Sequence, residues 1–227
     1  MSLPASPNNQ LELALVAKGN RFVLGIDEVG RGAIAGPVSV GIAVLDYDSK
    51  VDEWPAKLRD SKLISPRVRE ELVTQIQAWL TGFSIGSATA DEIDSLGIIE
   101  ALALAGRRAF SALSEDLIRE IYASKSVAIL DGSHNWLAGQ LGSVAVITQT
   151  KADRDCAVVA GASVLAKVER DAAMVQLSQL DKRFDWDGNK GYASPSQIAA
   201  LKEHGPSDYH RKTWLSKILG ENQLFHF

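Results

Sequence analysis

The stretch that decides the fold reads Gly25-Ile26-Asp27-Glu28-Val29-Gly30-Arg31-Gly32. It closes an apolar run that starts at Phe22, and a second apolar run follows at residues 36–45. Because the connection between the two runs is short and rich in glycine, it predicts an antiparallel pair of strands. Carboxylates at the end of a buried strand are unfavourable without a positive partner, so Asp27 and Glu28 indicate a bound divalent cation.

The turn after the two acids suits a phosphate group. Gly30 and Gly32 allow backbone amides to approach a ligand closely, and Arg31 carries a planar fork that matches phosphate. Paired acids beside such a turn indicate metal-assisted phosphodiester chemistry. Since consecutive strand residues point to opposite faces, we predict Asp27 as the central ligand and Glu28 as a more peripheral one.

The composition is that of a soluble globular protein, with 227 residues of which 46% are hydrophobic and 23% charged. The single cysteine, Cys156, excludes an intramolecular disulfide and fits a reducing compartment. The first ten residues do not resemble a signal peptide and no apolar run could span a membrane, so we expect a cytoplasmic protein. A net charge of -4 means that any attraction for nucleic acid is local.

Hydrophobic periodicity predicts the remaining elements. Strands are expected at residues 22–29, 36–45, 83–90, 126–130 and 143–148. Helices are expected at residues 10–18, 66–80, 98–113 and 155–180, with two short helical stretches near 195–204 and 207–218. Strands joined first by turns and then by helices predict an α/β fold, in which helices pack on a mixed sheet.

Acidic residues lie at three predicted strand ends: Asp27-Glu28, Asp131 and Asp153. Strand ends are where α/β sheets place ligand sites, so neighbouring strands would bring these carboxylates together. Each acid alone has a structural explanation as a turn residue or a helix cap. Their coincidence favours a two-metal site for Mg²⁺ or Mn²⁺, with ions about 3.5–4 Å apart.

The long predicted helix carries a polar stripe. Ser163, Lys167 and Arg170 lie at positions i, i+4 and i+7, so they share one side of the helix. The stripe begins soon after Asp153, which favours contact with the substrate for all three side chains. The alternative is an amphipathic helix with a solvated charged face.

Several short segments stand in the order GIDEVGRG (25–32), GPV (36–38), DSK (60–62), DG (131–132), KAD (151–153), ASVLAKVERD (162–171) and KGY (190–192). In this order they resemble bacterial ribonuclease HII, of the type 2 ribonuclease H family, over about residues 20–215. As a set they are specific, whereas DG or DSK alone would carry no information. Ala33, Ala160-Gly161 and the loop 133–136 depart from or vary within the family pattern without removing a catalytic group.

The resemblance implies a ribonuclease H-like fold, in which helices flank a mixed five-stranded sheet and a small helical appendage follows at the C-terminus. The predicted parts are a tail and short helix over residues 1–18, a catalytic core over 19–190 and a C-terminal segment over 191–227. The implied activity is a metal-dependent endonuclease that cuts the RNA strand of RNA–DNA hybrids. It also implies cleavage 5′ to ribonucleotides embedded in duplex DNA, leaving 3′-hydroxyl and 5′-phosphate ends by a two-metal carboxylate mechanism.

The resemblance also implies roles for individual residues. The family's catalytic and metal-binding acids match Asp27, Glu28, Asp131 and Asp153. The turn that reads the ribose matches Gly30, Arg31 and Gly32, and the tyrosine that senses the junction matches Tyr192. Positions near the substrate phosphates match Lys62, Ser163 and Lys167.

The C-terminal third leaves several interpretations open. Arg211 and Lys212 either extend the basic surface or are solvated, and the scattered histidines are interpreted as surface or hydrogen-bonding residues. Cys156 is interpreted as a small buried hydrophobe. The last residues, Gln223-Leu224-Phe225-His226-Phe227, loosely resemble a peptide that binds a sliding clamp. The alternative for this tail is packing on the core or fraying.

Other functions remain as alternatives to the nuclease. A non-catalytic module that binds hybrid duplexes would use Arg31, Lys167 and Tyr192 but would not need converging acids. A sugar-kinase-like ATPase would need two lobes with glycine-rich phosphate loops, for which this chain is short. Ribonuclease HIII is a near neighbour within the nuclease class, and it typically carries an extra N-terminal domain. We expect a monomer.

Overall fold

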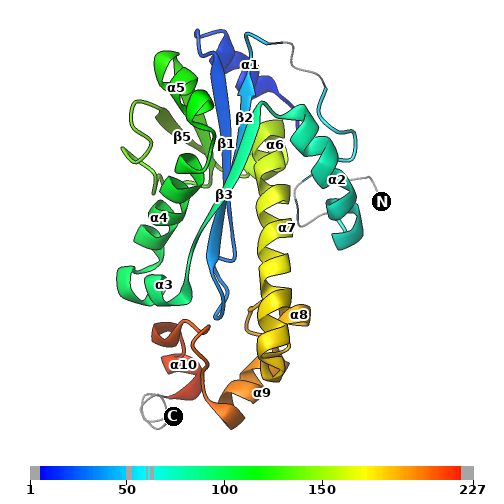
Figure 1. Ribbon diagram of the computed structural model, residues 1–227, viewed down its shortest axis with the longest axis vertical. Coiled ribbons are helices and arrows are strands. Elements are labelled where there is room, and N and C mark those ends of the chain that lie inside the picture. Colours follow the sequence, from blue (N-terminus) through cyan, green and yellow to red (C-terminus); the bar gives the residue numbers. More distant parts are fainter. Residues whose placement is uncertain (1–5, 50–52, 60, 62–63, 221–227) are drawn as a thin grey trace.

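A five-stranded mixed sheet forms the centre of the computed structural model, which describes residues 6–49, 53–59, 61 and 64–220 (Figure 1). Its strands are β1 (Phe22–Val29), β2 (Val38–Asp46), β3 (Gly82–Ala88), β4 (Ser126–Asp131) and β5 (Ala145–Gln149). They lie in the order β3-β2-β1-β4-β5. The first three strands pair antiparallel, whereas β4 runs parallel to both β1 and β5. The predicted mixed α/β sheet is confirmed.

Helices cover both faces of this sheet (Figure 1). One face packs on α3 (Ala90–Leu96), α4 (Ile98–Ser111) and α5 (Glu115–Ala123). The other packs on α1 (Gln10–Val16), α2 (Pro66–Trp79) and α7 (Ala157–Leu180). Along β1 the side chains alternate between the two cores, because Leu24 and Ile26 belong to the α4 side and Val23 to the α7 side. Each fully buried aliphatic side chain contributes roughly 1.5–3 kcal/mol.

Helix α7 lies unusually close to β1 because Gly25 has no side chain. A Cβ atom on Gly25 would lie 2.4 Å from the carbonyl carbon of Val158. This close approach brings the N-terminal part of α7, which includes Ser163, against β1. No helix in the described part of the chain is long and apolar enough to cross a membrane.

The prediction of one helix over residues 155–180 is wrong at the start of that range. The structure has a short helix α6 (Ala152–Asp155), an extended residue at Cys156 with φ -110° and ψ 125°, and then α7. The N-terminal segment causes the break, because Asn8 donates to the Asp155 carbonyl at 3.0 Å and accepts from the Ala157 N–H at 3.0 Å. A contact between distant parts of the chain is invisible to periodicity.

The third strand also ends earlier than predicted. Thr89 and Glu92 form a reciprocal capping box that starts α3 directly after β3, at the point where residues 83–90 were expected to stay extended. The pattern Thr-x-x-Glu is a helix-start signal that the sequence does carry. Neither α3 nor α5 was among the predicted helices.

The chain that follows α7, over residues 181–220, folds onto the end of that helix. It contains a 3₁₀ turn (Lys182–Phe184), α8 (Trp186–Asn189), α9 (Pro195–His204), a second 3₁₀ turn (Lys212–Trp214) and α10 (Ser216–Leu219). Residues 207–211 are not helical, so the helix expected over 207–218 is confirmed only in its second half. These elements enclose a small core of their own, which includes Phe184, Trp186 and Leu215.

His210 gives this segment a pH-dependent stability. Its ring is fully buried between Phe184 and Trp186, with centroid distances of 4.5 and 5.4 Å, and burial lowers its pKa from 6.5 to about 4. The unfolded state binds this proton more tightly than the folded state does. Above pH 6.5 His210 therefore does not reduce the free energy of unfolding. We expect it to fall by up to about 3 kcal/mol as the pH decreases towards 4.

Urea unfolding between pH 4 and 7.5 measures this effect. The His210→Gln variant, which has no titrating ring, should show a clearly flatter profile over the same range. An identical slope in both proteins would show that His210 is not the group responsible.

Candidate active site

The register of the central strands brings two acids to one edge of the sheet. β1 and β4 run parallel with Ile26 opposite Leu130, so Asp27 and Asp131 are the next residues along each strand. Asp131 shares the α7 face with Ile129, as Asp27 does with Val23. These two carboxylates therefore extend from neighbouring strands towards the same helix.

Asp153 joins this edge from the loop that follows β5. It lies in the first turn of α6 and is only 5% exposed. The turn is fastened to β4, because Asp131 Oδ1 accepts a hydrogen bond from the Ala152 N–H at 2.6 Å. The contact fixes Asp153 beside the end of β4.

Asp27 is one of the two buried acids of the four, with 6% of its surface exposed. Burial raises its pKa to about 8, a hydrogen bond with Ser163 opposes that rise, and the carboxylates of Glu28, Asp131 and Asp153 add to it. Each of the other three carboxylates thus lies close enough to Asp27 to raise its pKa, and their shared role as metal ligands stays a prediction. Such mutual repulsion is relieved by a cation.

The Glu28 side chain approaches the other three carboxylates from the opposite side of β1. Its carboxylate accepts a hydrogen bond from Arg31 Nη1 on Oε1 at 3.2 Å, while Oε2 is buried without a partner among the described residues. Burial raises the pKa of Glu28, and Arg31 opposes the rise. The more peripheral position predicted for Glu28 agrees with this placement.

The donor set suits a hard divalent cation, because it consists of carboxylate oxygens and includes the orphaned Glu28 Oε2. Within the described residues, however, no three His, Cys, Asp or Glu side chains already form a metal-binding group. Two of the acids are directed at protein partners instead, Glu28 at Arg31 and Asp131 at the Ala152 N–H. A rotation of Glu28 away from Arg31 would add its oxygens to the cluster.

The glycine turn beside the acids is built around a buried arginine. Gly30 has φ +80°, and a Cβ there would lie 1.9 Å from Nε of Arg170. Gly32, by contrast, faces open space. The turn therefore requires glycine at its first position for both conformation and packing.

Arg170 does not lie on the surface stripe that the sequence predicted. It is 1% exposed and donates to the carbonyls of Pro37 at 2.8 Å, Lys190 at 3.0 Å and Ala35 at 3.3 Å. With its guanidinium used inside the protein, it holds the turn and the loop at residue 190 together. Helical spacing placed it on the correct side of α7 but could not show that other segments cover that side.

Arg211 is the residue whose importance the sequence did not reveal. It is fully buried, its guanidinium stacks 4.9 Å above the Trp214 ring, and it donates to the carbonyls of Gly30, Arg31 and Gly36. Burial lowers its pKa to about 9. The expectation of a solvated basic surface at Arg211 is wrong, whereas Lys212 is exposed on its side chain.

Tyr192 stands at the surface next to the same turn. Its ring is 40% exposed and lies 5.7 Å from the Arg170 guanidinium. The preceding residue is tied to the loop after the turn, because the Gly191 carbonyl accepts from the Ile34 and Ala35 N–H groups. The structure thus brings Tyr192 and the glycine turn into one connected assembly.

The other predicted contacts on α7 have mixed outcomes. Ser163 is buried, bonds with Asp27 and lies 2.9 Å from the Ser61 hydroxyl, so it supports the acids from behind. Lys167 is part-buried, pairs with Asp171 and keeps 17% of its side chain exposed. Lys62 lies outside the described residues.

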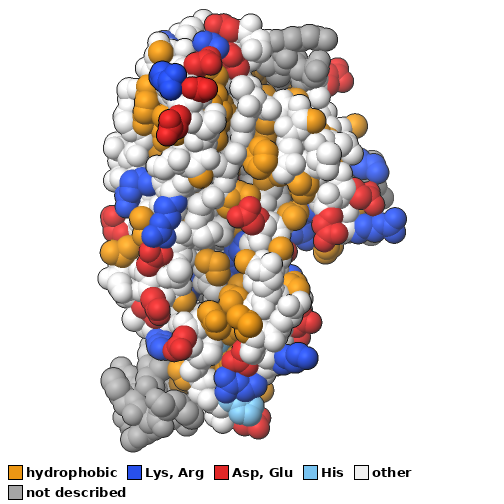
Figure 2. Space-filling view, in the orientation of Figure 1, with side chains coloured by type: hydrophobic (Ala, Val, Ile, Leu, Met, Phe, Trp, Pro, Cys, Tyr) orange, Lys and Arg blue, Asp and Glu red, His pale blue; other side chains and the backbone are white. Residues whose placement is uncertain are grey.

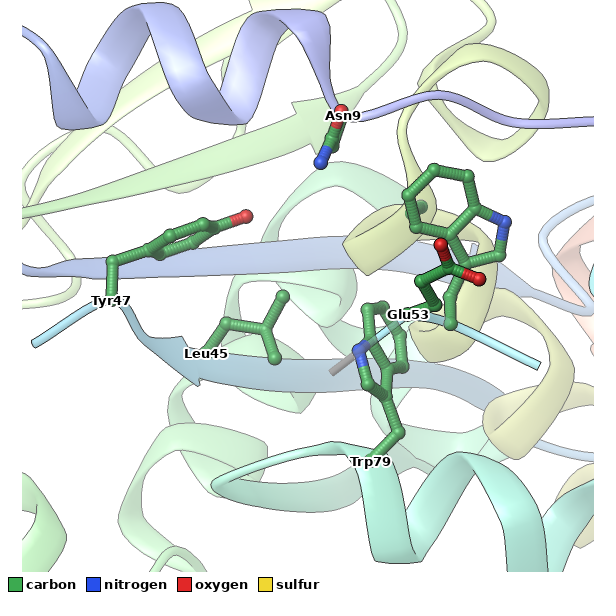
Figure 3. A pocket seen from close by; sticks show the side chains of 7 residues that line it. Asn9, Leu45, Tyr47, Glu53 and Trp79 are labelled. Carbon is green, nitrogen blue, oxygen red and sulfur yellow. The ribbon is translucent and has the colours of Figure 1, made fainter. Parts of the chain in front are cut away.

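Several hollows among the described residues lie away from the four acids. A cavity of about 120 Å³, lined by Leu45, Tyr47, Glu53 and Trp79 among others, sits at the opposite end of β1 and β2 from Asp27 (Figure 3). Basic and acidic side chains are intermingled on the face shown in Figure 2.

Sequence comparison places most of this chain in a known family. The family model described as ribonuclease HII matches residues 24–217. A ribonuclease HII from Streptomyces griseus is 42% identical over 212 residues, which cover 92% of this chain and 84% of that protein. All four acids, the glycine turn and Tyr192 lie within the matched range.

Solved structures agree with the sequence comparison. Ribonuclease H2 from Pyrococcus horikoshii superposes with a TM-score of 0.68 at 26% identity, covering 87% of this chain and 97% of that one. The ribonuclease HII of Archaeoglobus fulgidus, solved in a complex with PCNA, gives 0.67 at 25% identity over 90% of this chain and 100% of that one.

Proposed function

The chain belongs to the ribonuclease HII family and is therefore a ribonuclease H enzyme, and we propose that it cuts RNA embedded in or paired with DNA. The proposed substrates are the RNA strand of RNA–DNA hybrids and single ribonucleotides in duplex DNA. Cleavage 5′ to the ribonucleotide leaves 3′-hydroxyl and 5′-phosphate ends. The observation that carries the proposal is the convergence of four carboxylates on the buried Asp27, directly beside the glycine turn.

The four acids would hold two divalent ions, Mg²⁺ or Mn²⁺, through carboxylate oxygens. When bound, such ions activate water and stabilise the leaving 3′-oxygen. Asp27 contributes the central ligand, and Ser163 orients it through their hydrogen bond. Glu28 would also hold an ion, and without its bond to Glu28 the Arg31 guanidinium would be available to contact a substrate phosphate.

Recognition of RNA depends on the 2′-hydroxyl, which is the group that distinguishes it from DNA. In the proposed complex, backbone amides of Gly30-Arg31-Gly32 contact the ribose or its phosphate without steric interference. The exposed ring of Tyr192 stacks on the neighbouring deoxyribose, where a 2′-hydroxyl would be disfavoured. Lys167 and Lys62 contribute charge along the phosphate backbone.

The direct test is incubation with a DNA duplex that contains one ribonucleotide, with Mg²⁺ and with a chelator in place of Mg²⁺. We expect one cut, 5′ to the ribonucleotide, only when the metal is present. Binding without metal-dependent cleavage would instead identify a non-catalytic hybrid-binding module. Cleavage at other positions would overturn the proposed recognition.

Replacing Tyr192 by alanine should weaken junction preference more than total affinity. Without the ring that disfavours a 2′-hydroxyl on the neighbouring sugar, we expect the cleavage ratio between junction and uniform RNA sites to fall roughly tenfold, which corresponds to about 1.4 kcal/mol. Tyr122→Ala is the matched control, because Tyr122 is 44% exposed on the distant helix α5. An unchanged ratio in Tyr192→Ala would remove Tyr192 from junction sensing.

A sliding clamp is a proposed partner through the tail Gln223–Phe227, which lies outside the described residues. The support is the loose motif together with the PCNA complex of the Archaeoglobus protein. Titration of a labelled tail peptide with the clamp of the source organism tests this contact. A signal that does not change at high clamp concentration would dispose of it.

A further inference from the structure

Arg211 is buried for a reason that the stability of the C-terminal segment does not explain. A buried guanidinium is unfavourable unless its donors are satisfied. The guanidinium of Arg211 donates to carbonyls of the loop after β1, at 2.7 Å to Gly30, 2.8 Å to Arg31 and 3.1 Å to Gly36. These acceptors lie 181, 180 and 175 residues away in sequence.

The direction in which these carbonyl groups point also fixes the direction of the N–H groups in the same peptide units. Each peptide unit is planar and trans, so its C=O and the following N–H point to opposite sides. Because the carbonyls of Gly30 and Arg31 point inward to Arg211, the N–H groups of Arg31 and Gly32 point away from it. Neither N–H donates a hydrogen bond to any residue that the structure describes.

The surroundings of these two N–H groups fit a ligand outside the protein. Both residues are exposed, and a Cβ on Gly32 would meet nothing within 4 Å. The turn follows directly on Asp27 and Glu28, so the two donors lie next to the proposed cleavage site. Two adjacent, outward N–H groups form a small concave donor pair of the kind that binds phosphate or hydroxyl oxygens.

We propose that Arg211 is a positioning residue, which aims the N–H groups of Arg31 and Gly32 at the ribose and phosphate of the cleaved strand by holding the carbonyls of Gly30 and Arg31 inside the protein. The inference deepens the proposed function and rests on it. Arg211 itself does not touch the substrate. Its rigid fork serves several carbonyls at once, which a lysine ammonium on a flexible stem cannot reproduce.

The test measures discrimination rather than activity alone. In a cleavage-inactive Asp27→Asn background, dissociation constants are measured for a duplex with one ribonucleotide and for the same duplex made only of DNA. Arg211→Lys should lower the ratio of these two constants about ten- to a hundredfold, since each well-aligned hydrogen bond changes affinity by about tenfold. Binding to the DNA-only duplex should stay within about twofold.

Two further variants separate positioning from general destabilisation. Arg21→Lys is the matched control, because Arg21 pairs with Asp46 and Glu120 at the far end of β1 and its loss should lower stability without changing the ratio. Trp214→Leu removes the ring under the Arg211 guanidinium and should lower the ratio by a smaller factor. This variant also serves if Arg211→Lys does not fold.

Each outcome has one meaning. A wild-type enzyme that does not distinguish the two duplexes would overturn the proposed function and the inference with it. If the wild type distinguishes the two duplexes and the ratio of dissociation constants is unchanged in both Arg211→Lys and Trp214→Leu, the inference is overturned but the proposed function is not. If the ratio of dissociation constants falls equally in Arg211→Lys and Arg21→Lys, Arg211 has only a structural role.

Discussion

Replacing Asp27 by asparagine should abolish cleavage, with a loss of at least about a thousandfold, while duplex binding changes little. Asparagine keeps the shape and can still accept the Glu28 N–H bond at Oδ1, which is 2.8 Å long. It removes the negative charge on which cation binding depends. A loss of this size is typical when one member of a catalytic unit is removed. Single-turnover cleavage with excess enzyme measures it.

The same variant should be more stable than the wild type without metal. The pKa of Asp27 is raised above its ordinary value to about 8, so the wild type loses free energy of unfolding as the pH rises from about 4 to 8. Asparagine has no such titration.

Asp48→Asn, which changes a side chain that is 74% exposed, is the control and should cleave like the wild type. Full activity in Asp27→Asn would refute the role of Asp27.

Replacing Gly30 by alanine should destabilise the fold by about 2–4 kcal/mol and remove most of the activity. The new Cβ would overlap Nε of Arg170, which three carbonyls hold in place, and the residue would keep a left-handed φ of +80°. Overpacking and a strained backbone each contribute about 1–3 kcal/mol. Urea unfolding gives the stability, and the single-ribonucleotide duplex gives the activity.

Gly19 provides the control for this variant. It has φ +86° but nothing lies within 4 Å of a Cβ at that position, so Gly19→Ala carries the backbone strain without the clash. We expect a loss of about 1 kcal/mol and unchanged cleavage. Equal destabilisation by the two substitutions would mean that Arg170 moves aside and that the turn is not rigidly held.

The sequence predicts the sheet and the acids because these depend on local signals. Continuous apolar runs end in Asp27 and Asp131, and the strands pair as their connections require. The face assignment of Asp27 and Glu28 follows from strand geometry alone. What a single strand or turn specifies can be inferred without knowing its neighbours.

Two of the buried arginines, Arg170 and Arg211, could not be predicted for the opposite reason. Arg170 and Arg211 resemble ordinary surface residues, and their acceptors are backbone carbonyls, which every residue possesses. Only contacts across more than a hundred residues show that they support the glycine turn. The break at Cys156 has the same origin, because it depends on the distant Asn8.

The central claim is that oxygen atoms of Asp27, Glu28, Asp131 and Asp153 together hold divalent cations. The most direct measurement is the anomalous scattering of Mn²⁺ in crystals of the enzyme bound to a ribonucleotide-containing duplex. We expect manganese peaks in contact with the Asp27 carboxylate, with Glu28 turned away from Arg31 to join them. Manganese found elsewhere, or four carboxylates that stay apart in its presence, would contradict the account.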